Sequence, residues 1–267
     1  MDDIMVSICM ITYNHEKYII QAIEGVLMQK TNFPIELIIG EDYSTDNTRK
    51  ICLEYKEKYP NIIKLLLPDK NLGANQNSRN TLEACRGKYI AMCEGDDYWT
   101  DSHKLQKQVD FLEMYDDFSM CFHNAIRNNL YDGTRQNFNN PLNKNIFNIK
   151  DVILKPWFTP TASIVYRNDK DFVDIEWYGI NGDMKILFLN SLKGKLYYFD
   201  EIMSMYNYGT PGSISDFNKH LFMPLYRKKF VLLNHFDQYT HFKYFHLTSL
   251  KRIKMVIGIF LKIIRIR

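Results

Sequence analysis

The chain has 267 residues, which is enough to bury one large α/β core with an appendage. Hydrophobic residues make up 46% of it and charged residues 24%, so its composition excludes a disordered or fibrous protein. The formal charge of +3 is too small to indicate nucleic-acid binding, and the basic residues gather near the C-terminus, which suggests contact with a membrane surface instead.

The first part of the chain alternates between apolar runs and helical patterns. Apolar runs predict strands at 5–11, 35–39, 62–67 and 89–93. The segments between them predict a helix at 16–29, a second capped by Ser44 or Thr45 with Asp46 in its first turn, and a third at 75–85. This order is typical of an α/β fold with a Rossmann-like, mostly parallel central sheet flanked by helices, whose ligands bind beyond the carboxyl ends of the strands.

The segment RGKYIAMCEGDDYWTDSHKL, residues 86–105, holds the most concentrated chemistry. Glu94, Asp96 and Asp97 directly follow the fourth strand. Three carboxylates this close repel one another and lose hydration when partly buried, so they favour a cationic partner. Mg²⁺ or Mn²⁺ suits such oxygen ligands and usually completes its coordination shell with water and phosphates, which points to a nucleotide. The alternative is a solvated acidic turn that caps the next helix.

The second part of the chain is less regular. We expect a helix at 100–117, a strand at 119–123, a long loop at 128–148, a strand at 162–166, a helix at 183–192 and a strand at 196–199. No internal repeat or low-complexity linker forces a boundary before about residue 210. We therefore predict one domain over 1–210 and a helical, basic, amphipathic extension over 211–267.

The last segment, KRIKMVIGIFLKIIRIR, is typical of a helix that lies on a membrane surface. On a helix, one face carries basic residues and the opposite face apolar ones: Lys251, Lys254, Lys262 and Arg265 against Ile253, Val256, Ile257, Phe260 and Ile264. Aromatic residues upstream suit the same interface: Tyr239, Phe242, Tyr244 and Phe245. The alternative is a helix packed on the domain or on a second subunit of a homodimer.

Five cysteines occur without CxxC or His-paired spacing, mostly in apolar runs: Cys9, Cys52, Cys85, Cys93 and Cys121. They predict buried, reduced thiols in a cytosol. The first ten residues carry acids where a signal peptide has bases, and no apolar run approaches the roughly 20 residues of a membrane span. We therefore expect a cytoplasmic protein.

Four segments, in this order and spacing, resemble the inverting family 2 glycosyltransferases of the GT-A fold, which are common in bacterial capsule, O-antigen and exopolysaccharide synthesis. They are VSICMITYNHEKYI, ELIIGEDYSTDNT, NLGANQNSRNTLEACRGKYIAMCEGDDYWTDSHKLQKQVDFLE and NGDMKILFLNSLKGKLYYFDEIMSMY, within residues 4–210. The resemblance implies that a sugar moves with inversion from a nucleotide-sugar donor to a glycan or lipid-linked acceptor, at the inner face of the cell membrane. It also implies a nucleotide-sugar half over about 1–100 and an acceptor half over about 101–210.

The resemblance assigns the donor site residue by residue. Thr12, Tyr13, Asn14 and Glu16 match residues that contact the nucleotide. Glu41, Asp42 and Ser44 match the segment that binds the base and ribose. Asn77 and Arg79 match polar positions before the fourth strand. A carboxylate at this edge can accept hydrogen bonds from uracil and from ribose hydroxyls, so a UDP-sugar is the favoured donor. Many relatives have Asp-Asp-Gly-Ser where this chain has Glu41 to Ser44.

The DxD motif of the family corresponds to Glu94, Gly95 and Asp96. Asp96 matches the ligand of Mn²⁺ or Mg²⁺, Asp97 is close enough to assist, and Glu94 matches an acid on the ribose side. Glu94 is a departure, since the family has Asp there. The metal would bridge the two phosphates and neutralise the charge that grows on the leaving nucleoside diphosphate.

Asp183, at the start of a helix, matches the catalytic base of the family. A carboxylate there would take the proton of the acceptor hydroxyl, and the helix N-terminus should help keep it ionised. The alternatives are a simple helix cap, or Asp174 or Glu176 as the base. On the acceptor side we expect Thr161, Trp157 as a ring that stacks on a sugar, and His123, for which a buried structural role is the alternative.

Many relatives carry Tyr-Arg-x-His after the last matched strand, whereas this chain has Tyr206, Asn207, Tyr208 and Gly209. This loss and Glu94 motivate a second hypothesis, a non-catalytic, membrane-associated assembly subunit of the same fold. A nucleotidyltransferase is a further alternative, but it would typically have a Gly-rich, basic phosphate loop near the first strand, which this chain lacks.

Overall fold

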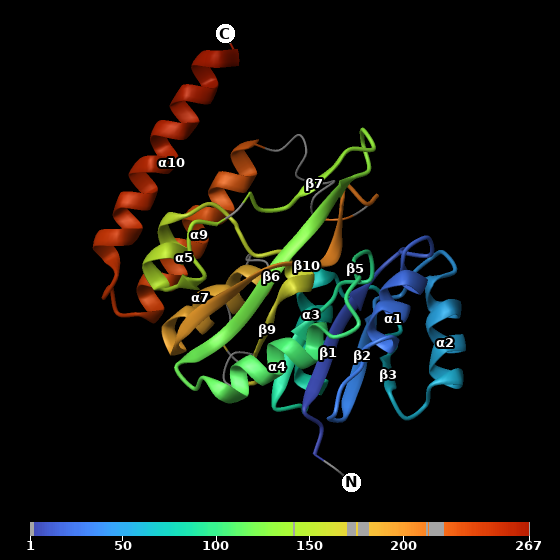
Figure 1. The fold of residues 1–267 in the computed structure, drawn as a ribbon. Coiled ribbons are helices and arrows are strands. Elements are labelled where there is room, and N and C mark those ends of the chain that lie inside the picture. Colours follow the sequence, from blue (N-terminus) through green and yellow to red (C-terminus); the bar gives the residue numbers. More distant parts are fainter. Residues whose placement is uncertain are drawn as a thin grey trace.

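The computed structural model describes residues 3–140, 142–169, 175, 182–211, 213 and 222–266, and they form a mixed sheet with helices on both faces (Figure 1). Its first block consists of parallel strands in the order β3-β2-β1-β4: β1 Val6–Thr12, β2 Ile35–Glu41, β3 Ile63–Leu66 and β4 Tyr89–Met92. β1 pairs with β2 over its whole length, from Val6 opposite Ile35 to Thr12 opposite Glu41. The loops that follow these strands therefore leave the same edge of the sheet.

The second block joins the first through β9, Val165–Arg167, which runs antiparallel to β4 and to β6, Phe118–Asn129. β6 is parallel to β10, Lys195–Tyr208, and β5, Tyr98–Trp99, is antiparallel to β10. The short strands β7, Arg135–Asn137, and β8, Ile146–Phe147, pair with β6 and β10. The predicted α/β sheet is confirmed, with parallel pairing in its first block and mixed pairing in its second.

Two apolar cores lie on the two faces of the sheet. One contains side chains of α1 Ile19–Leu27, α2 Thr48–Lys58 and α4 Lys104–Met114. The other contains side chains of α3 Ala74–Ala84, α5 Ile149–Leu154, α7 Gly182–Lys193, α9 Phe222–Tyr239 and α10 Phe245–Ile266. All five cysteines are buried and free, as predicted.

Several predicted boundaries were wrong because tertiary contacts decide them. The second helix begins at Thr48, and Ser44 and Thr45 bind the loop after β1 instead of capping it. The helix expected at 100–117 is Lys104–Met114, since residues 98–99 pair with β10. The loop expected at 128–148 contains the end of β6 together with β7 and β8. The strand expected at 196–199 extends over Lys195–Tyr208.

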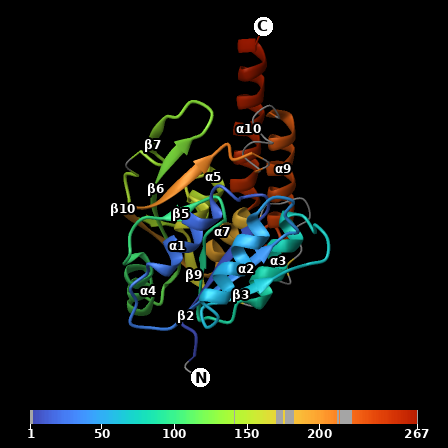
Figure 2. The ribbon, with the colours of Figure 1, turned by 90° about the vertical axis from the view of Figure 1, so that its right-hand side faces the viewer.

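The C-terminal helices are packed on the second block of the sheet. The rings of Phe236 in α9 and Phe188 in α7 lie 5.0 Å apart. The ammonium of Lys251 in α10 donates hydrogen bonds to the carbonyls of Leu154 and Lys155, at 3.0 and 2.8 Å. α9 and α10 lie side by side, and the far end of α10 projects beyond the rest of the molecule (Figure 2). Within the described part of the chain, no helix is both long and apolar enough to cross a membrane.

Candidate active site

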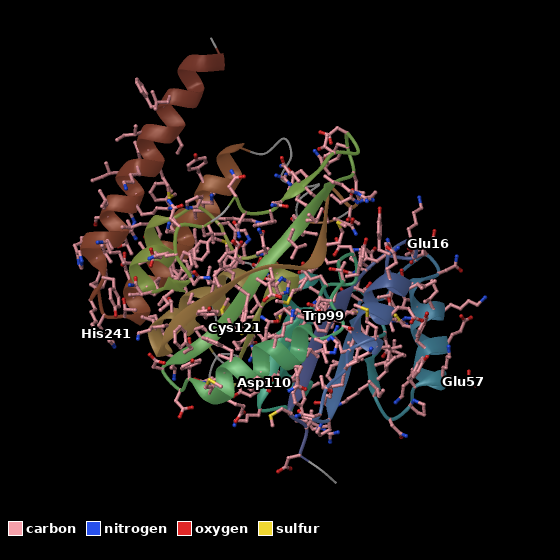
Figure 3. The ribbon with its side chains drawn as sticks, viewed as in Figure 1. Glu16, Glu57, Trp99, Asp110, Cys121 and His241 are labelled. Atoms are coloured by element: carbon pink, nitrogen blue, oxygen red, sulfur yellow. The ribbon has the colours of Figure 1, made fainter. Side chains whose placement is uncertain are left out.

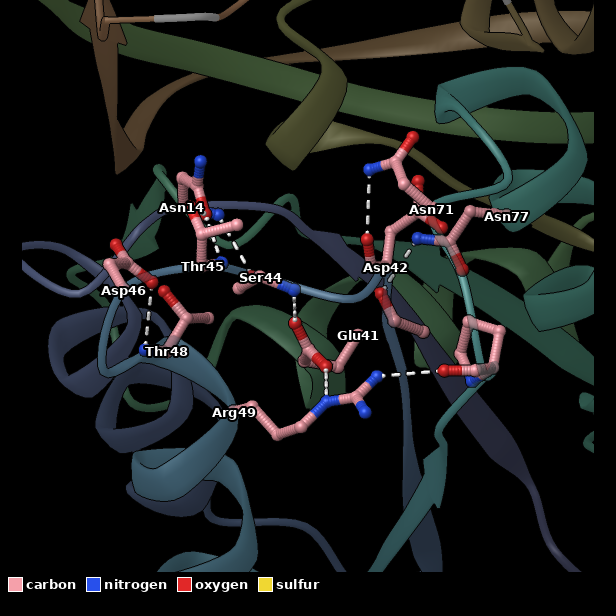
Figure 4. A network of polar contacts seen from close by, with 12 residues as sticks. Asn14, Glu41, Asp42, Ser44, Thr45, Asp46, Thr48, Arg49, Asn71 and Asn77 are labelled. Atoms are coloured by element: carbon pink, nitrogen blue, oxygen red, sulfur yellow. Dashed lines mark hydrogen bonds and ion pairs between the residues drawn. The ribbon is translucent and has the colours of Figure 1, made fainter.

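Two loops at the carboxyl edge of the sheet are joined by hydrogen bonds (Figure 4). The backbone N–H groups of Asn14 and His15 donate to the hydroxyls of Ser44 and Thr48, at 3.0 and 2.8 Å. In return, the Oδ1 of Asn14 accepts from the N–H of Thr45 at 2.8 Å. Asn14 has a φ of 56°, a left-handed conformation that asparagine tolerates better than most residues. Together these contacts fix the path of the chain after β1.

Glu16 strengthens this connection. Its carboxylate accepts from the backbone and side-chain amides of Asn47, at 3.1 and 2.9 Å, and its own N–H donates to Asp46 at 3.1 Å. Asp46 also accepts from the N–H of Thr48, so it supports the start of α2 from just outside the helix. Tyr13 lies beside these contacts and is 40% exposed. The structure thus brings Thr12, Tyr13, Asn14, Glu16 and Ser44 together at one edge.

Glu41 and Asp42 are both buried and already hydrogen-bonded by the protein. Glu41 forms an ion pair with Arg49 and accepts from the N–H of Ser44 at 2.7 Å. Asp42 accepts from the N–H groups of Leu72 and Gly73, at 2.7 and 2.9 Å. These contacts make both carboxylates supports for the adjacent loops, and their contact with a nucleotide stays a prediction.

α3 holds two further predicted donor residues. Asn77 is buried and donates to the carbonyl of Gly40 at 2.7 Å, so it fastens α3 to β2. A Cβ atom at Gly40 would lie 2.4 Å from the Oδ1 of Asn77, which requires glycine there. Arg79 pairs with Glu83 at 2.9 Å along the same helix.

The acidic turn after β4 lies directly on the loop after β1. The N–H of Gly95 donates to the carbonyl of Ile11 at 2.9 Å. A Cβ atom at Gly95 would lie 2.6 Å from the hydroxyl of Thr12 and 3.1 Å from the Nδ1 of His15, so no side chain fits there. His15 also places its Nε2 3.9 Å from a carboxylate oxygen of Asp96. The sequence reasoning overlooked His15, although it lies between two predicted donor residues.

Asn207 in β10 holds the same turn from the other side. Its N–H donates to the carboxylate of Asp97 at 2.9 Å, and its side-chain amide donates to the carbonyl of Asp96 at 2.6 Å. Asn128 in β6 donates in turn to the Oδ1 of Asn207 at 2.8 Å. Asn207 had been noted only as a departure from the Tyr-Arg-x-His pattern. Its contact with the turn depends on strand pairing that one sequence does not reveal.

The acidic turn carries uncompensated negative charge. Burial, followed by the neighbouring carboxylate of Asp96, raises the pKa of Glu94 and of Asp97 well above the usual range. The second carboxylate oxygen of Asp97 is buried and has no hydrogen-bond partner among the described residues. Hard oxygen donors with surplus negative charge fit Mn²⁺ or Mg²⁺. Over the described part of the chain, however, no three His, Cys, Asp or Glu side chains form a ready metal cage, so donor phosphates or water would have to complete the shell.

Asp183 lies within electrostatic reach of this turn, since its charge contributes to the raised pKa of Glu94. Its carboxylate accepts from the N–H of Met184 at 2.7 Å and from the hydroxyl of Thr161 at 3.3 Å. Burial raises the pKa of Asp183 despite these two hydrogen bonds, which act to lower it. The backbone N–H of Met184 acts to lower this pKa, in the direction expected at a helix N-terminus, but desolvation outweighs it and the net shift is upward.

The predicted acceptor-side residues do not lie together. Thr161 is bonded to Asp183, but His123 is completely buried, with its Nδ1 2.7 Å from the carbonyl of Asn124. Burial lowers the pKa of His123 well below its usual value, which favours the structural alternative for this residue. Trp157 lines a separate pocket among α5, α7, α9 and α10. Asp174 and Glu176 lie outside the described residues.

Lys104, a buried lysine at the start of α4, was not predicted from the sequence. Lys104 has no exposed surface, and its ammonium lies 4.0 Å from the ring centre of Trp99. Burial lowers its pKa to about 7. Trp99 lies near the centre of the molecule (Figure 3), and its indole N–H donates to the carbonyl of Ala162 at 2.8 Å. This contact connects the segment after the acidic turn to the segment that carries Thr161.

The mixed sheet, its flanking helices and the loops that meet at its carboxyl edge define an α/β fold of the GT-A type. The chain belongs to glycosyl transferase family 2, because the sequence profile of that family matches residues 7–168. It is 38% identical over 200 residues to the uncharacterized protein Rv1520 of Mycobacterium tuberculosis, an alignment that covers 75% of this chain and 58% of that protein. It is 35% identical over 132 residues to the Escherichia coli UDP-Glc:alpha-D-GlcNAc-diphosphoundecaprenol beta-1,3-glucosyltransferase WfgD, covering 47% of this chain and 50% of WfgD. The chain thus spans little more than half the length of these relatives.

Solved structures share the fold at low sequence identity. The Staphylococcus aureus TarS 1-349 complex with UDP-GlcNAc has a TM-score of 0.63 at 18% identity, covering 87% of this chain and 65% of that one. The Pyrobaculum calidifontis mannosyltransferase PcManGT, in complex with GDP-Man and Mn²⁺, has a TM-score of 0.57 at 12% identity, covering 95% of this chain and 74% of that one. These likenesses establish the GT-A fold.

Proposed function

We propose that this protein transfers a sugar, with inversion, from a nucleotide-sugar donor to a glycan or lipid-linked acceptor in bacterial surface-polysaccharide synthesis. The observation that carries the proposal is the convergence of the loop after β1, the loop after β2 and the acidic turn at the carboxyl edge of the sheet, with Asp183 close enough for its charge to contribute to the raised pKa of Glu94. Family membership supports the reaction class, and the names of WfgD and of the TarS complex support a UDP-sugar.

The donor would occupy the edge formed by the loops after β1, β2 and β4. Two exposed tyrosine rings stand there, Tyr13 with 40% and Tyr43 with 46% of its surface exposed. They offer flat apolar faces for a base or a ribose, while the carboxylates of Glu41 and Asp42 set the positions of the loops behind them. The hydrogen bonds between the loops mean that this edge is formed before the donor arrives, which reduces the entropic cost of binding.

A divalent cation fits the acidic turn. Asp96, and Asp97 with its unpartnered buried oxygen, would hold Mn²⁺ or Mg²⁺, with Glu94 on the ribose side. When bound, the metal would neutralise charge on the departing nucleoside diphosphate. Asn207 and Gly95 then matter indirectly, because they fix the backbone on which the carboxylates stand.

Asp183 is the proposed general base. Its raised pKa makes it a stronger base than an ordinary aspartate, and the hydroxyl of Thr161 orients its carboxylate. Asp183 would take the proton of the acceptor hydroxyl while that oxygen attacks the anomeric carbon from the face opposite the phosphate, which inverts the configuration. General-base catalysis of this kind contributes about 10²–10⁴ in rate.

The C-terminal helices support a peripheral position at the inner face of the cell membrane. α10 exposes Ile253, Ile257 and Phe260, each of which is more than half exposed. The same apolar face would also suit a second copy in a homodimer. It is compatible, too, with the second candidate function, a non-catalytic membrane-associated subunit, which the departures from the family pattern at Glu94 and at Asn207 to Gly209 favour.

Calorimetric titration with UDP and with GDP, each in Mn²⁺ and in EDTA, tests the proposal. UDP binding that needs Mn²⁺, followed by turnover of at least one UDP-sugar, is the expected result. Binding of GDP but not of UDP would indicate a GDP-sugar as the donor. No binding of either nucleotide would overturn the enzymatic proposal and support the non-catalytic alternative.

A further inference from the structure

His15 faces the acidic turn with a nitrogen atom that can bind a metal. Its Nε2 lies 3.9 Å from a carboxylate oxygen of Asp96, and both side chains are only 12% exposed. This separation is too long for a hydrogen bond, in which the N···O distance is about 2.7–3.2 Å. It is shorter than twice the usual metal–ligand distance of about 2.1 Å, so one divalent cation can contact both atoms. The imidazole and the carboxylate are therefore spaced to hold an ion between them.

The neighbours of His15 fix its position in the loop after β1. Its backbone N–H donates to the hydroxyl of Thr48 at 2.8 Å, which ties the residue to the start of α2. Its ring packs edge-on against the ring of Tyr18, with the ring centres 6.5 Å apart. The backbone of the acidic turn lies against the imidazole, since a Cβ atom at Gly95 would be 3.1 Å from the Nδ1 of His15. A ligand that is already held in place loses less entropy when it binds.

The hydroxyl of Thr12 determines which nitrogen of His15 faces Asp96. The Nδ1 of His15 lies 3.2 Å from this hydroxyl, and Thr12 is buried. When Nδ1 carries the proton and donates it to Thr12, the lone pair of Nε2 is available to a cation. Histidines that bind metals typically donate their other ring N–H to an oxygen in this way, which fixes the tautomer and the orientation of the ring. Thr12 thus supports His15 as a ligand.

An imidazole ligand also affects which cation the site prefers. Oxygen ligands suit both Mg²⁺ and Mn²⁺, but Mn²⁺ accepts a nitrogen ligand more readily because it is a transition metal. One carboxylate and one imidazole leave the other coordination positions to water and to the phosphates of a donor. This number of protein ligands agrees with the finding that, within the described part of the chain, no three His, Cys, Asp or Glu side chains form a metal cage.

We propose that His15 is a direct ligand of the divalent cation at the acidic turn, beside Asp96, and that it makes this site prefer Mn²⁺ to Mg²⁺. The inference rests on the metal site proposed above and names a nitrogen ligand for it. His15 belongs to the same loop as Thr12, Tyr13 and Asn14, the residues proposed to contact the nucleotide. The loop after β1 would therefore hold the cation and the nucleotide together.

Electron paramagnetic resonance tests the proposal with Mn²⁺ as the probe. In the full chain with Mn²⁺ and UDP, pulsed spectra should show the electron spin coupled to an imidazole nitrogen, and His15→Gln should lose this coupling. The matched control is His103→Gln, which changes an exposed histidine just before α4 and should keep the coupling. Bound Mn²⁺ without nitrogen coupling in the parent protein, or coupling that persists in His15→Gln, would overturn the proposal while leaving a metal site in place.

Metal affinity gives a second readout, measured from the signal of free Mn²⁺ and by competition with Mg²⁺. His15→Gln should weaken Mn²⁺ binding about 10-fold or more and Mg²⁺ binding less, so the preference for Mn²⁺ should fall. Thr12→Val removes only the hydroxyl that supports the ring, and it should weaken Mn²⁺ binding about 10-fold in a folded protein. Equal weakening of both cations by His15→Gln would contradict a nitrogen ligand. A parent protein that binds UDP but no Mn²⁺ would overturn the proposed metal site itself.

Discussion

The carboxyl edge of the first sheet block and the helical end of the molecule are built by different physical means. At the sheet edge, loops are joined by short hydrogen bonds in which backbone amides donate to the side chains of Ser44, Thr48 and Asp97. At the helical end, ring packing and one buried ion pair hold α9 to α10, and an apolar face is left exposed. The fixed loops of the sheet edge suit a reaction that needs exact geometry. The exposed apolar face of the helical end suits the membrane contact proposed above.

The largest expected effect separates catalysis from donor binding. Asp183→Asn should lower the turnover number by about 10²–10⁴, because the amide cannot accept the proton of the acceptor hydroxyl. Its affinity for UDP with Mn²⁺ should stay that of the parent protein, measured by calorimetry beside a turnover assay. Asp110→Asn, on the exposed side of α4, is the control and should keep full turnover. A parallel loss of donor affinity in Asp183→Asn would contradict the separate role.

The next effect concerns the helical end. Arg252 pairs with the buried carboxylate of Asp237 at 2.7 Å, and Thr248 donates to the same carboxylate at 2.8 Å. Arg252→Met should lower the free energy of unfolding by about 2–4 kcal/mol, because it leaves a buried charge without its cation. Urea unfolding measures this loss, and UDP affinity should not change at temperatures where the variant is folded. If donor affinity fell as well, the two regions would not be independent.

A smaller effect is expected at the acidic turn. Asp96→Asn should weaken UDP binding about 10–100-fold in Mn²⁺, since a neutral amide is a poorer ligand for a hard cation. In EDTA, where UDP is expected to bind weakly, the variant and the parent should have the same affinity for it. Calorimetric titration in both conditions gives the comparison. A loss of the same size in EDTA would mean that Asp96 contacts the nucleotide itself.

The smallest effect is a dependence of stability on pH. The pKa of Glu94 is raised in the folded state, so the folded protein is penalised as pH rises above the unfolded value of about 4.5 and through the raised folded value. Glu94→Gln removes this penalty and should raise the Tm of the metal-free protein at pH 7 by about 2–4 °C. The gain should vanish at pH 4, where the glutamate is protonated in both states. Scanning calorimetry with Glu57→Gln in α2 as the control checks it, and a gain independent of pH would refute it.

The sequence predicted the first block of the fold well because β1 to β4 are continuous apolar runs separated by helical segments. It also predicted that Thr12, Glu41 and Glu94 follow strands that end at one edge, since parallel strands share their direction. The two-residue strands β5 and β8 and the six-residue helix α5 were missed. Elements this short carry too little periodicity and form only through long-range pairing.

The site was predicted less completely than the fold. A resemblance identifies a position such as Asp96, but it does not say what holds that position in place. Asn207 lies 111 residues from Asp96 along the chain, and its role depends on how β10 pairs with β6. Trp157 was grouped with Thr161 because it is near it in sequence, and His123 because it follows a predicted strand. In the structure, however, Trp157 lines the pocket among α5, α7, α9 and α10, and His123 is completely buried in β6.

Gly95 has a consequence for protein engineering. Its backbone lies so close to Thr12 and His15 that no side chain fits between them. A loop taken from a homologue must therefore reproduce that spacing, or it will push the acidic turn away from β1. Chimeras that change donor preference should exchange residues 12–16, 41–48 and 94–97 as one set, while hybrids with a single foreign loop should misplace the turn.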